Sequence, residues 1–394
     1  NTGKEVSFPL PVSDIAAVRI GTTIGTNALL ERKGARTALL MTKGFKDLLL
    51  IGNQSRPKIF DLDIKKFDCL AEVIEEVDER IEVLSHQEKS SVAEDAVSHQ
   101  IVKAVNEEKV RQVLRDLKKR GIESIAVSLM HSYATAEHEV TVGRLAKEEG
   151  FSAVFLSHES SNKIGYLARS STCLLDAYLF PIIHKYFQRI LAKFEDSGKN
   201  LPVFIMQSDG AITPLSEFSG SKSILSGPAG GVSGFSKTTT LGGKKSHKLI
   251  GFDMGGTSTD VSTFEGNYEM NYESEIAGTF VSTPHLDINT VAAGGGSCLS
   301  FNHGLFRVGP ESAGSNPGPV CYGKNGLLAV TDLNLILGRI QAEYFPRIFG
   351  KNQDQPLDLA QSQAKFAELV EVIKKAEPRF KDSTIEEIAY GFIQ

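Results

Sequence analysis

The chain contains 394 residues, enough for two or more domains that each bury a hydrophobic core. Its formal net charge of −5 and its pI near 6.1 argue against a general nucleic-acid-binding protein. A hydrophobic content of 41% and a charged content of 23% are those of an ordinary globular protein, and no apolar run is long enough to cross a bilayer. The composition therefore predicts neither a nucleic-acid partner nor a membrane partner.

The four cysteines are scattered along the chain, and no two of them form a Cys-x-x-Cys pair. This spacing provides no zinc or disulfide framework and suits the reducing cytosol, where we expect the protein to lie. The chain starts at Asn1 rather than Met and stops at Gln394 inside a predicted helix. These ends predict that the sequence is a fragment of a longer protein.

Strands and helices alternate through the first half of the chain. A strand at residues 17–20 runs into a glycine–threonine turn at 21–26, which either touches a ligand or closes a packed turn. Apolar residues recur at helical spacing in residues 107–119, with Gly121 as the expected helix stop. The other elements are strands at 37–41, 124–130, 153–156 and 202–206, and helices at 45–50, 136–149 and 171–194, the last interrupted or kinked at Pro181. Such alternation predicts α/β layers.

One histidine lies where a predicted strand ends, in the sequence Met130-His131-Ser132-Tyr133. His131 is a candidate general base, but a single histidine at such a position more often has a structural hydrogen-bonding role. Cys321 lies in a loop rich in proline and glycine, with no obvious histidine partner. That setting argues against a nucleophilic role.

The stretch around which the chain is organised extends from Leu249 to Ser262. An apolar run ends in an acid, and two glycines, two threonines and a second acid follow: Asp253, Gly255, Gly256, Thr257, Thr259 and Asp260. The pattern predicts a strand, a tight glycine turn and a second strand, followed by a turn at residues 265–267 and a third strand at 268–272.

This turn has a chemical use. Because glycine has no Cβ, the amides of Gly255 and Gly256 can approach a phosphate group closely, and the hydroxyls of Thr257 and Thr259 are further donors. Asp253, at the end of a predicted buried strand, is the expected Mg²⁺ ligand, because that ion is usually bound by one or two carboxylates and water. An ordinary acidic β-hairpin is the alternative, and the stretch is neither a Walker A loop nor a Rossmann fingerprint.

Four glycine-bearing turns together predict a cleft lined by backbone amides, as nucleotide phosphates require. The turns are residues 21–26, 209–210 with 227–231, 253–259 and 294–297. The further glycines expected to face the nucleotide are Gly227, Gly230, Gly231, Gly294, Gly295 and Gly296. Asp260 and Asp287 join Asp253 as candidate catalytic acids, although Asp287 is equally well a turn or cap aspartate.

Several ordered stretches are similar to the A-type half of the hydantoinase/oxoprolinase family, and the hairpin resembles the phosphate hairpin of the actin, sugar-kinase and heat-shock chaperone ATPases. The stretches are Gly21–Gly34, Thr42–Leu49, Leu225–Gly231, Gly251–Asp260, Ala293–Ser297, Gly309–Gly314, Pro317–Gly323 and Thr331–Asp332. Asn289, Asn53–Pro57 and Phe345–Gly350 favour the oxoprolinase branch of the family. The resemblance extends over nearly the whole chain.

The resemblance implies an α/β fold of the actin-like ATPase (ribonuclease-H-like) type, with duplicated domains whose mixed sheets are flanked by helices. Residues 1–245 are the expected N-terminal region and first domain, and residues 246–394 the second domain with the phosphate hairpin. Family members start with an earlier hairpin of the same type, which this sequence lacks. We therefore expect the first domain to be truncated at its N-terminus and the second at its C-terminus.

The implied activity is ATP-dependent opening of the 5-oxo-L-proline lactam to L-glutamate, a step of the glutathione cycle, with Mg²⁺ and K⁺. The implied partners are a B-type half of the same polypeptide and, at full length, a second copy in a homodimer. We expect the fragment alone not to turn over 5-oxo-L-proline. Two alternatives stay open: an N-methylhydantoinase or ketone-carboxylase subunit, and a non-catalytic nucleotide-binding member.

Overall fold

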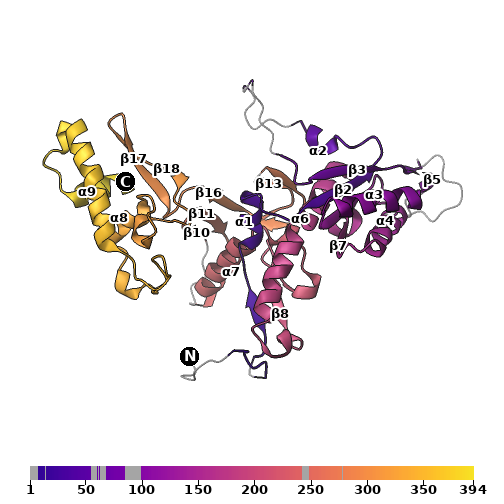
Figure 1. Cartoon of the computed structure of the whole chain (residues 1–394), viewed down its shortest axis with the longest axis horizontal. Helices are drawn as coiled ribbons and strands as arrows, with labels where there is room; N and C mark the ends of the chain where they lie inside the picture. The colour runs from indigo at the N-terminus through magenta and orange to yellow at the C-terminus, as the bar shows by residue number, and fades with distance from the viewer. Residues whose placement is uncertain are drawn as a thin grey trace. The chain divides into compact units, whose positions relative to one another are not determined.

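The computed structural model describes residues 8–13, 15–54, 60, 62, 68–84, 99–241, 248–276 and 278–394. The chain forms two compact units (Figure 1): the first is the chain up to Lys237 together with Tyr268–Asp287, and the second is Thr238–Asn267 with Ile288–Gln394. The sequence predicts one boundary near residue 245, and the return of Tyr268–Asp287 to the first unit has no counterpart in that prediction. Most of the branch-specific stretch Asn53–Pro57 lies outside the described residues.

The main sheet of the first unit is parallel. Its strands lie in the order β3 (Val73–Val77), β2 (Thr37–Thr42), β6 (Ser124–Ser128) and β7 (Ala153–Leu156). Every residue of β2 and β6 is buried, as expected for a parallel sheet that helices cover on both faces.

Side chains of β2 alternate between two hydrophobic cores. Ala38 and Leu40 pack with α3 (Glu107–Lys119) and α4 (Glu137–Glu148), whereas Leu39 and Met41 pack with α6 (Tyr166–Leu191). This alternation, which follows from the two-residue period of a strand, places helices on both faces of the sheet (Figure 1). Gly121 follows α3 with φ +78°, so the predicted glycine stop is confirmed.

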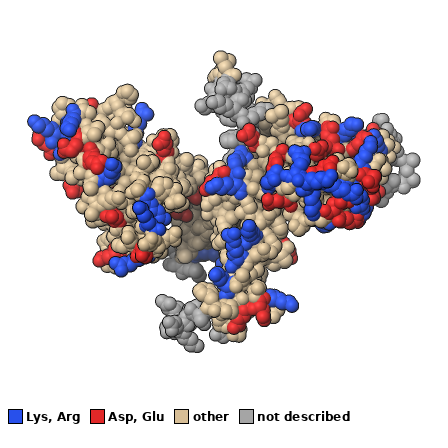
Figure 2. Space-filling model, viewed as in Figure 1, with Lys and Arg blue, Asp and Glu red and all other residues tan. Residues whose placement is uncertain are grey.

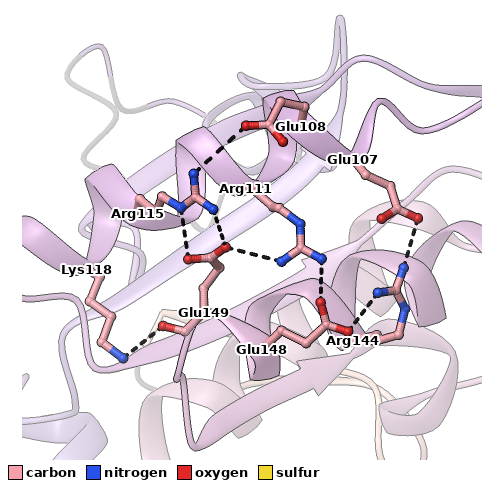
Figure 3. Close-up of polar contacts among 8 residues, drawn as sticks. All are labelled: Glu107, Glu108, Arg111, Arg115, Lys118, Arg144, Glu148 and Glu149. Carbon is pink, nitrogen blue, oxygen red and sulfur yellow. Dashed lines mark hydrogen bonds and ion pairs between the residues drawn. The ribbon is translucent and has the colours of Figure 1, made fainter.

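Ion pairs tie α3 to the end of α4 (Figure 3). Arg115 contacts Glu149 at 3.1 Å, Arg111 contacts Glu148 and Glu149, and Arg144 contacts Glu107 at 2.8 Å. The basic and acidic side chains are interleaved on this face of the first unit, so neither sign dominates there (Figure 2).

The other elements of the first unit are short, apart from α7. The strands are β1 (Val18–Ile20), β4 (Arg80–Val83), β5 (His99–Lys103), β8 (Val203–Met206), β9 (Ile212–Pro214), β12 (Met270–Asn271), β13 (Ser274–Ile276), β14 (Thr279–Val281) and β15 (His285–Leu286). The helices are α1 (Ile24–Leu30), α2 (Leu48–Ile51), α5 (Ser157–Ser160) and α7 (Ser226–Leu241), whose last residues belong to the second unit. Pro181 lies inside α6, which runs without the predicted interruption.

The second unit contains a three-stranded sheet in the order β10 (Leu249–Met254), β11 (Thr259–Phe264) and β16 (Ile288–Val291). The hairpin β17 (Ser297–Asn302) and β18 (Leu305–Ser312) follows, and then α8 (Val330–Ile336), α9 (Leu359–Ala376) and α10 (Ile385–Ile393). These helices share a core whose buried members are Leu333, Phe366, Val370, Ile373, Ile388, Ala389 and Phe392.

The predicted third strand forms at Met270–Asn271 but does not pair with the central hairpin. Residues 270–271 pair with β15 in the first unit, and the second neighbour of β11 is β16. The two units are therefore interleaved in sequence: the chain leaves the second unit after Asn267 and re-enters it at Ile288. Among the described residues, no helix has the length and apolar character of a membrane span.

Candidate functional site

The central hairpin forms as predicted between β10 and β11, with residues 255–258 as its loop. Asp253 lies opposite Asp260, and Met254 lies opposite Thr259. The Gly255 N–H donates to the Ser258 carbonyl at 2.9 Å and closes the turn. The Gly255 amide is therefore engaged within the loop, which leaves Gly256 and Thr257 as the amides with a possible role toward a ligand.

β10 is an exposed edge strand rather than the predicted buried one. Ile250, Phe252 and Met254 are 76%, 70% and 48% exposed. In the described part of the chain β10 has one neighbouring strand, β11, and no buried core includes its side chains. Asp253 points to the opposite face from these apolar residues, because side chains alternate along a strand.

Two carboxylates face each other at the mouth of the hairpin. Asp253 and Asp260 are direct cross-strand partners, so their side chains lie on the same face of the sheet. Thr290 is the partner of Asp260 on β16, and its hydroxyl donates to the Asp260 carboxylate at 2.7 Å. Like charges directly opposite destabilise a sheet, and a cation between them would relieve that repulsion.

The acid pair fits a hydrated Mg²⁺. The described residues contain no group of three or more His, Cys, Asp or Glu side chains that could enclose a metal ion. Mg²⁺ needs no such cage, because it keeps several waters and takes one or two carboxylates together with phosphate oxygens. Asp253 and Asp260 are therefore the residues that could hold this ion.

The loop at residues 294–297 braces the hairpin. The N–H groups of Gly295 and Gly296 donate to the carbonyls of Gly255 and Gly256 at 3.0 and 2.6 Å. A Cβ on Gly294 would lie 2.7 Å from the carbonyl carbon and oxygen of Gly256. The glycines of this loop thus allow a close backbone approach that fixes the hairpin turn.

Two further predicted residues have other partners. The Thr259 hydroxyl donates to the Ala293 carbonyl at 2.6 Å, and this residue is 6% exposed. Asp287 belongs to the first unit, where it accepts a hydrogen bond from the Asn271 amide at 2.8 Å. Of the three candidate acids, the structure brings together Asp253 and Asp260.

In the first unit, the turn at residues 21–26 lies against the start of α7. The Ser226 hydroxyl donates to the Thr22 carbonyl at 2.6 Å, and a Cβ on Gly227 would lie 2.7 Å from the Thr23 methyl group. Gly230 and Gly231 have open space, since a Cβ on either would meet no atom within 4 Å. In the first unit, residues 21–26 thus lie against the 227–231 part of the second predicted turn, and in the second unit residues 253–259 lie against residues 294–297. The other part of that second turn, residues 209–210, lies beside Leu286.

Cys321 is fully buried beside the buried carboxylate of Asp332. Asp332 accepts hydrogen bonds from the Cys321 N–H at 2.8 Å and from the Ser362 hydroxyl at 2.8 Å, so it holds loop and helices together. Burial, reinforced by this carboxylate, raises the pKa of the Cys321 thiol far above its usual range. A thiol in this state is not a nucleophile.

A largely buried charged cluster lies at the carboxyl ends of β2, β3, β6 and β7, and His131 is the member that the sequence pattern singles out. We call it the carboxyl-edge cluster; its members are Glu79, His131, His138, Glu139, His158 and Arg169. His138 Nδ1 lies 2.6 Å from Glu79, and His158 Nδ1 lies 2.6 Å from Glu139. Glu139 also accepts from the Leu129 N–H at 2.8 Å, and its hydrogen bond to His158 raises the pKa of that histidine.

Arg169 is fully buried in this cluster, yet its guanidinium donates its hydrogen bonds to neutral oxygens. The guanidinium donates to the Ser157 hydroxyl at 2.9 Å and to the carbonyls of Lys163 and Leu129 at 2.7 and 2.8 Å. One signal in the sequence points to this cluster: His131 and His158 closely follow predicted strands, and parallel strands end at one edge of a sheet. Glu79 and Glu139 each lie next to other charged residues in the sequence, and this pattern is typical of the protein surface. The sequence therefore gives no sign that these two side chains are buried.

Comparison with known proteins identifies the class. Residues 3–150 match the model described as "Hydantoinase/oxoprolinase N-terminal region", and residues 169–394 match "Hydantoinase/oxoprolinase". The chain belongs to the hydantoinase/oxoprolinase family.

Among its relatives is 5-oxoprolinase 1 of Arabidopsis thaliana, which is 49% identical over all of this chain. The chain spans about a third of the length of the curated 5-oxoprolinases it matches, namely 32% of the Arabidopsis protein.

Two solved structures share the fold. Nucleotide-free acetone carboxylase superposes with a TM-score of 0.73 at 23% identity, covering 97% of this chain and 52% of that one. ATP-dependent caprolactamase from Pseudomonas jessenii superposes with a TM-score of 0.64 at 25% identity, covering 97% of this chain and 53% of that one. The expected α/β fold with mixed sheets flanked by helices is confirmed.

Proposed function

We propose that this chain supplies nucleotide-binding machinery of an ATP-dependent enzyme that opens 5-oxo-L-proline to L-glutamate, with release of ADP and phosphate. The observation that carries the proposal is the facing pair Asp253 and Asp260 at the mouth of a glycine hairpin. The 49% identity to a 5-oxoprolinase supports the choice of substrate. Because that relative is about three times as long, the activity of the whole protein is part of the proposal.

The chemistry requires coupling, since a five-membered lactam is a poor electrophile. Attack of the lactam oxygen on the γ-phosphorus forms an O–P bond, and the bond from that phosphorus to ADP breaks. Water then adds to the electron-poor carbon, and the ring C–N bond breaks with a proton passing to nitrogen, which leaves an acyl phosphate. A second water hydrolyses this acyl phosphate, so that phosphate leaves and the γ-carboxylate of glutamate remains. The contribution of the protein is to position the groups and to neutralise charge around the phosphoryl group.

Each hairpin residue has a distinct part in this scheme. The amides of Gly256 and Thr257 donate to phosphate oxygens, while the Gly255 amide closes the turn. Asp253 and Asp260 would hold Mg²⁺, which would neutralise phosphate charge when bound. Thr259 and the glycines 294–296 keep the hairpin in place.

Further assignments belong to the same proposal. Gly230 and Gly231 give the start of α7 a surface open enough for a nucleotide, and Gly227 allows the turn at Thr23 to lie close against it. Asp287 stays a candidate catalytic acid, oriented by Asn271. We also propose a cytosolic location, in keeping with four free thiols, together with use of K⁺, a B-type half and a homodimer at full length.

Substrate-stimulated ATP hydrolysis tests the proposal. The assay uses the protein at the length of its relatives, with 5-oxo-L-proline, hydantoin or caprolactam as the added cyclic amide. We expect 5-oxo-L-proline alone to stimulate ATP cleavage, with glutamate formed in equal amount. Stimulation by hydantoin or caprolactam instead would assign another cyclic-amide hydrolase, and no stimulation would favour a non-catalytic nucleotide-binding member.

A further inference from the structure

We propose that the carboxyl edge of the sheet β3-β2-β6-β7 is a second ligand site. There Arg80 and His131 bind a small molecule in which one carbon carries both a carboxylate and an N–H group. 5-Oxo-L-proline has this arrangement, so the identity of the ligand rests on the proposed function. The site lies wholly in the first unit, and it shares no residue with the hairpin of the second unit.

The strand order places a topological switch point between β2 and β6. From β2 the chain proceeds to β3 on one side of the sheet, and from β6 it proceeds to β7 on the other side. Loops that leave neighbouring parallel strands in opposite directions leave a crevice between them, and ligands of open α/β sheets bind there.

Arg80 lies across this switch point. Its guanidinium donates to the Lys43 carbonyl, just after β2, at 3.1 Å, and reaches the Met130 sulfur, just after β6, at 3.7 Å. It also lies over the Phe45 ring, 5.6 Å from the centroid. Among the described residues, no carboxylate lies within 4 Å of this guanidinium.

An arginine of this kind is suited to an anion. The guanidinium is planar and can bind a carboxylate through two parallel N–H···O bonds, and stacking on an aromatic ring fixes its orientation beforehand. The neighbouring acids are already engaged: Glu79 contacts His138 at 2.6 Å, and Asp78 contacts Lys103 at 2.7 Å. The positive charge of Arg80 is thus left for a ligand.

His131 provides the second contact. It follows Met130 with φ +64°, a left-handed conformation that is uncommon outside glycine. Its Nδ1 atom is buried and has no hydrogen-bond partner in the described structure, which costs free energy that a donor would recover. Burial and the nearby charges of Arg169 and Arg80 lower the pKa of His131, which keeps the ring neutral with one nitrogen as an acceptor.

The two residues match two parts of the ligand. Arg80 takes the carboxylate, and His131 accepts the N–H bonded to the adjacent carbon, after the half-buried ring turns about its side-chain bonds. The frame around them is fixed, because the Thr42 hydroxyl accepts from the Met130 N–H at 2.8 Å and thereby ties the two loops together.

Calorimetric titration of the 394-residue chain with 5-oxo-L-proline, without nucleotide, tests this site. Pyrrolidin-2-one, the same lactam without the carboxylate, is the control ligand. Arg80→Gln removes the guanidinium and its two parallel N–H donors. Arg19→Gln is the matched control, because the Arg19 guanidinium also lies over a phenylalanine ring, 5.8 Å from the ring centroid. His131→Asn removes the imidazole and keeps the backbone conformation, because asparagine adopts positive φ readily. His303→Asn is its control, since His303 also has a positive φ, +52°.

We expect saturable binding of 5-oxo-L-proline and none of pyrrolidin-2-one. Arg80→Gln should weaken binding by roughly tenfold or more. Arg80→Lys should weaken it by less, since lysine keeps the positive charge but lacks the planar guanidinium that binds a carboxylate through two N–H groups. His131→Asn should also weaken binding, while both control variants bind as the wild type does. Thermal unfolding verifies that each variant is folded.

Three results would overturn the proposal: no binding, equal binding by Arg80→Gln and Arg19→Gln, or equal binding of both lactams. If L-glutamate or acetate binds with the same dependence on Arg80 and 5-oxo-L-proline does not, the named ligand is wrong. None of these results bears on the hairpin, whose test uses Asp253 and ATP hydrolysis.

Discussion

A methyl group on Gly294 should disrupt the hairpin through backbone contacts alone. In Gly294→Ala the new Cβ lies 2.7 Å from the carbonyl carbon and oxygen of Gly256 and 2.8 Å from the Gly255 oxygen. Ordinary van der Waals contacts of carbon start near 3.5 Å, so the turn or the loop must move. Overpacking of this kind typically costs about 1–3 kcal/mol.

Gly256→Ala is the matched control, because a Cβ there meets no atom within 4 Å. We expect thermal unfolding to show a lower melting temperature for Gly294→Ala, by about 4 °C for each kcal/mol lost, and no change for Gly256→Ala. ATP affinity should fall in both: in the first because the turn is displaced, and in the second because the methyl group stands where a phosphate approaches. Equal stability of Gly294→Ala and the wild type would refute the bracing role of this loop.

Three further predictions concern the remainder of the chain. The hydrogen bond to Glu139 raises the pKa of His158 above 6.5 in the folded chain. The stabilisation from this pair is therefore complete below pH 6.5 and is lost as the pH rises through the folded-state pKa of His158, so the melting temperature should fall over that pH range. Glu139→Gln should flatten this dependence, and an unchanged slope would contradict the assignment. The Cys321 thiol should resist alkylation at pH 8 in the folded chain and react after denaturation, whereas rapid labelling of the folded chain would show that it is accessible. Arg111→Ala should lower the melting temperature at low salt and less at high salt, since it pairs with Glu149 on the surface (Figure 3); a loss independent of salt would indicate packing instead.

Local patterns in the sequence predict most of the elements that matter. The alternation of strands and helices around residues 37–156 leads to the observed parallel sheet, and Gly121 ends α3 as expected. The turn after Asp253 follows from its two glycines, and the cross-strand pairing with Asp260 follows from the length of that turn.

The errors arise where distant parts of the chain decide the outcome. The third strand of the hairpin sheet is β16 because residues 268–287 return to the first unit, and no local pattern encodes that excursion. The apolar run of β10 predicts a buried strand, yet Phe252 is 70% exposed because no described element packs on it.

The carboxyl-edge cluster escaped prediction for a related reason. Glu79 and Glu139 are separated by a long stretch of sequence. Only the order of the strands in the sheet brings both residues to its carboxyl edge. His131 was accessible to sequence reasoning, since it ends a predicted strand, but its unpartnered Nδ1 is visible only in three dimensions.

The central claim is that Asp253 and Asp260 support ATP-dependent opening of 5-oxo-L-proline. The most direct measurement is glutamate formation coupled to ATP cleavage in the protein at the length of its relatives, for the wild type, Asp253→Asn, Asp260→Asn and the exposed control Asp354→Asn. The account predicts loss of both products in the first two variants and wild-type rates in the control. Undiminished glutamate formation by Asp253→Asn would contradict it.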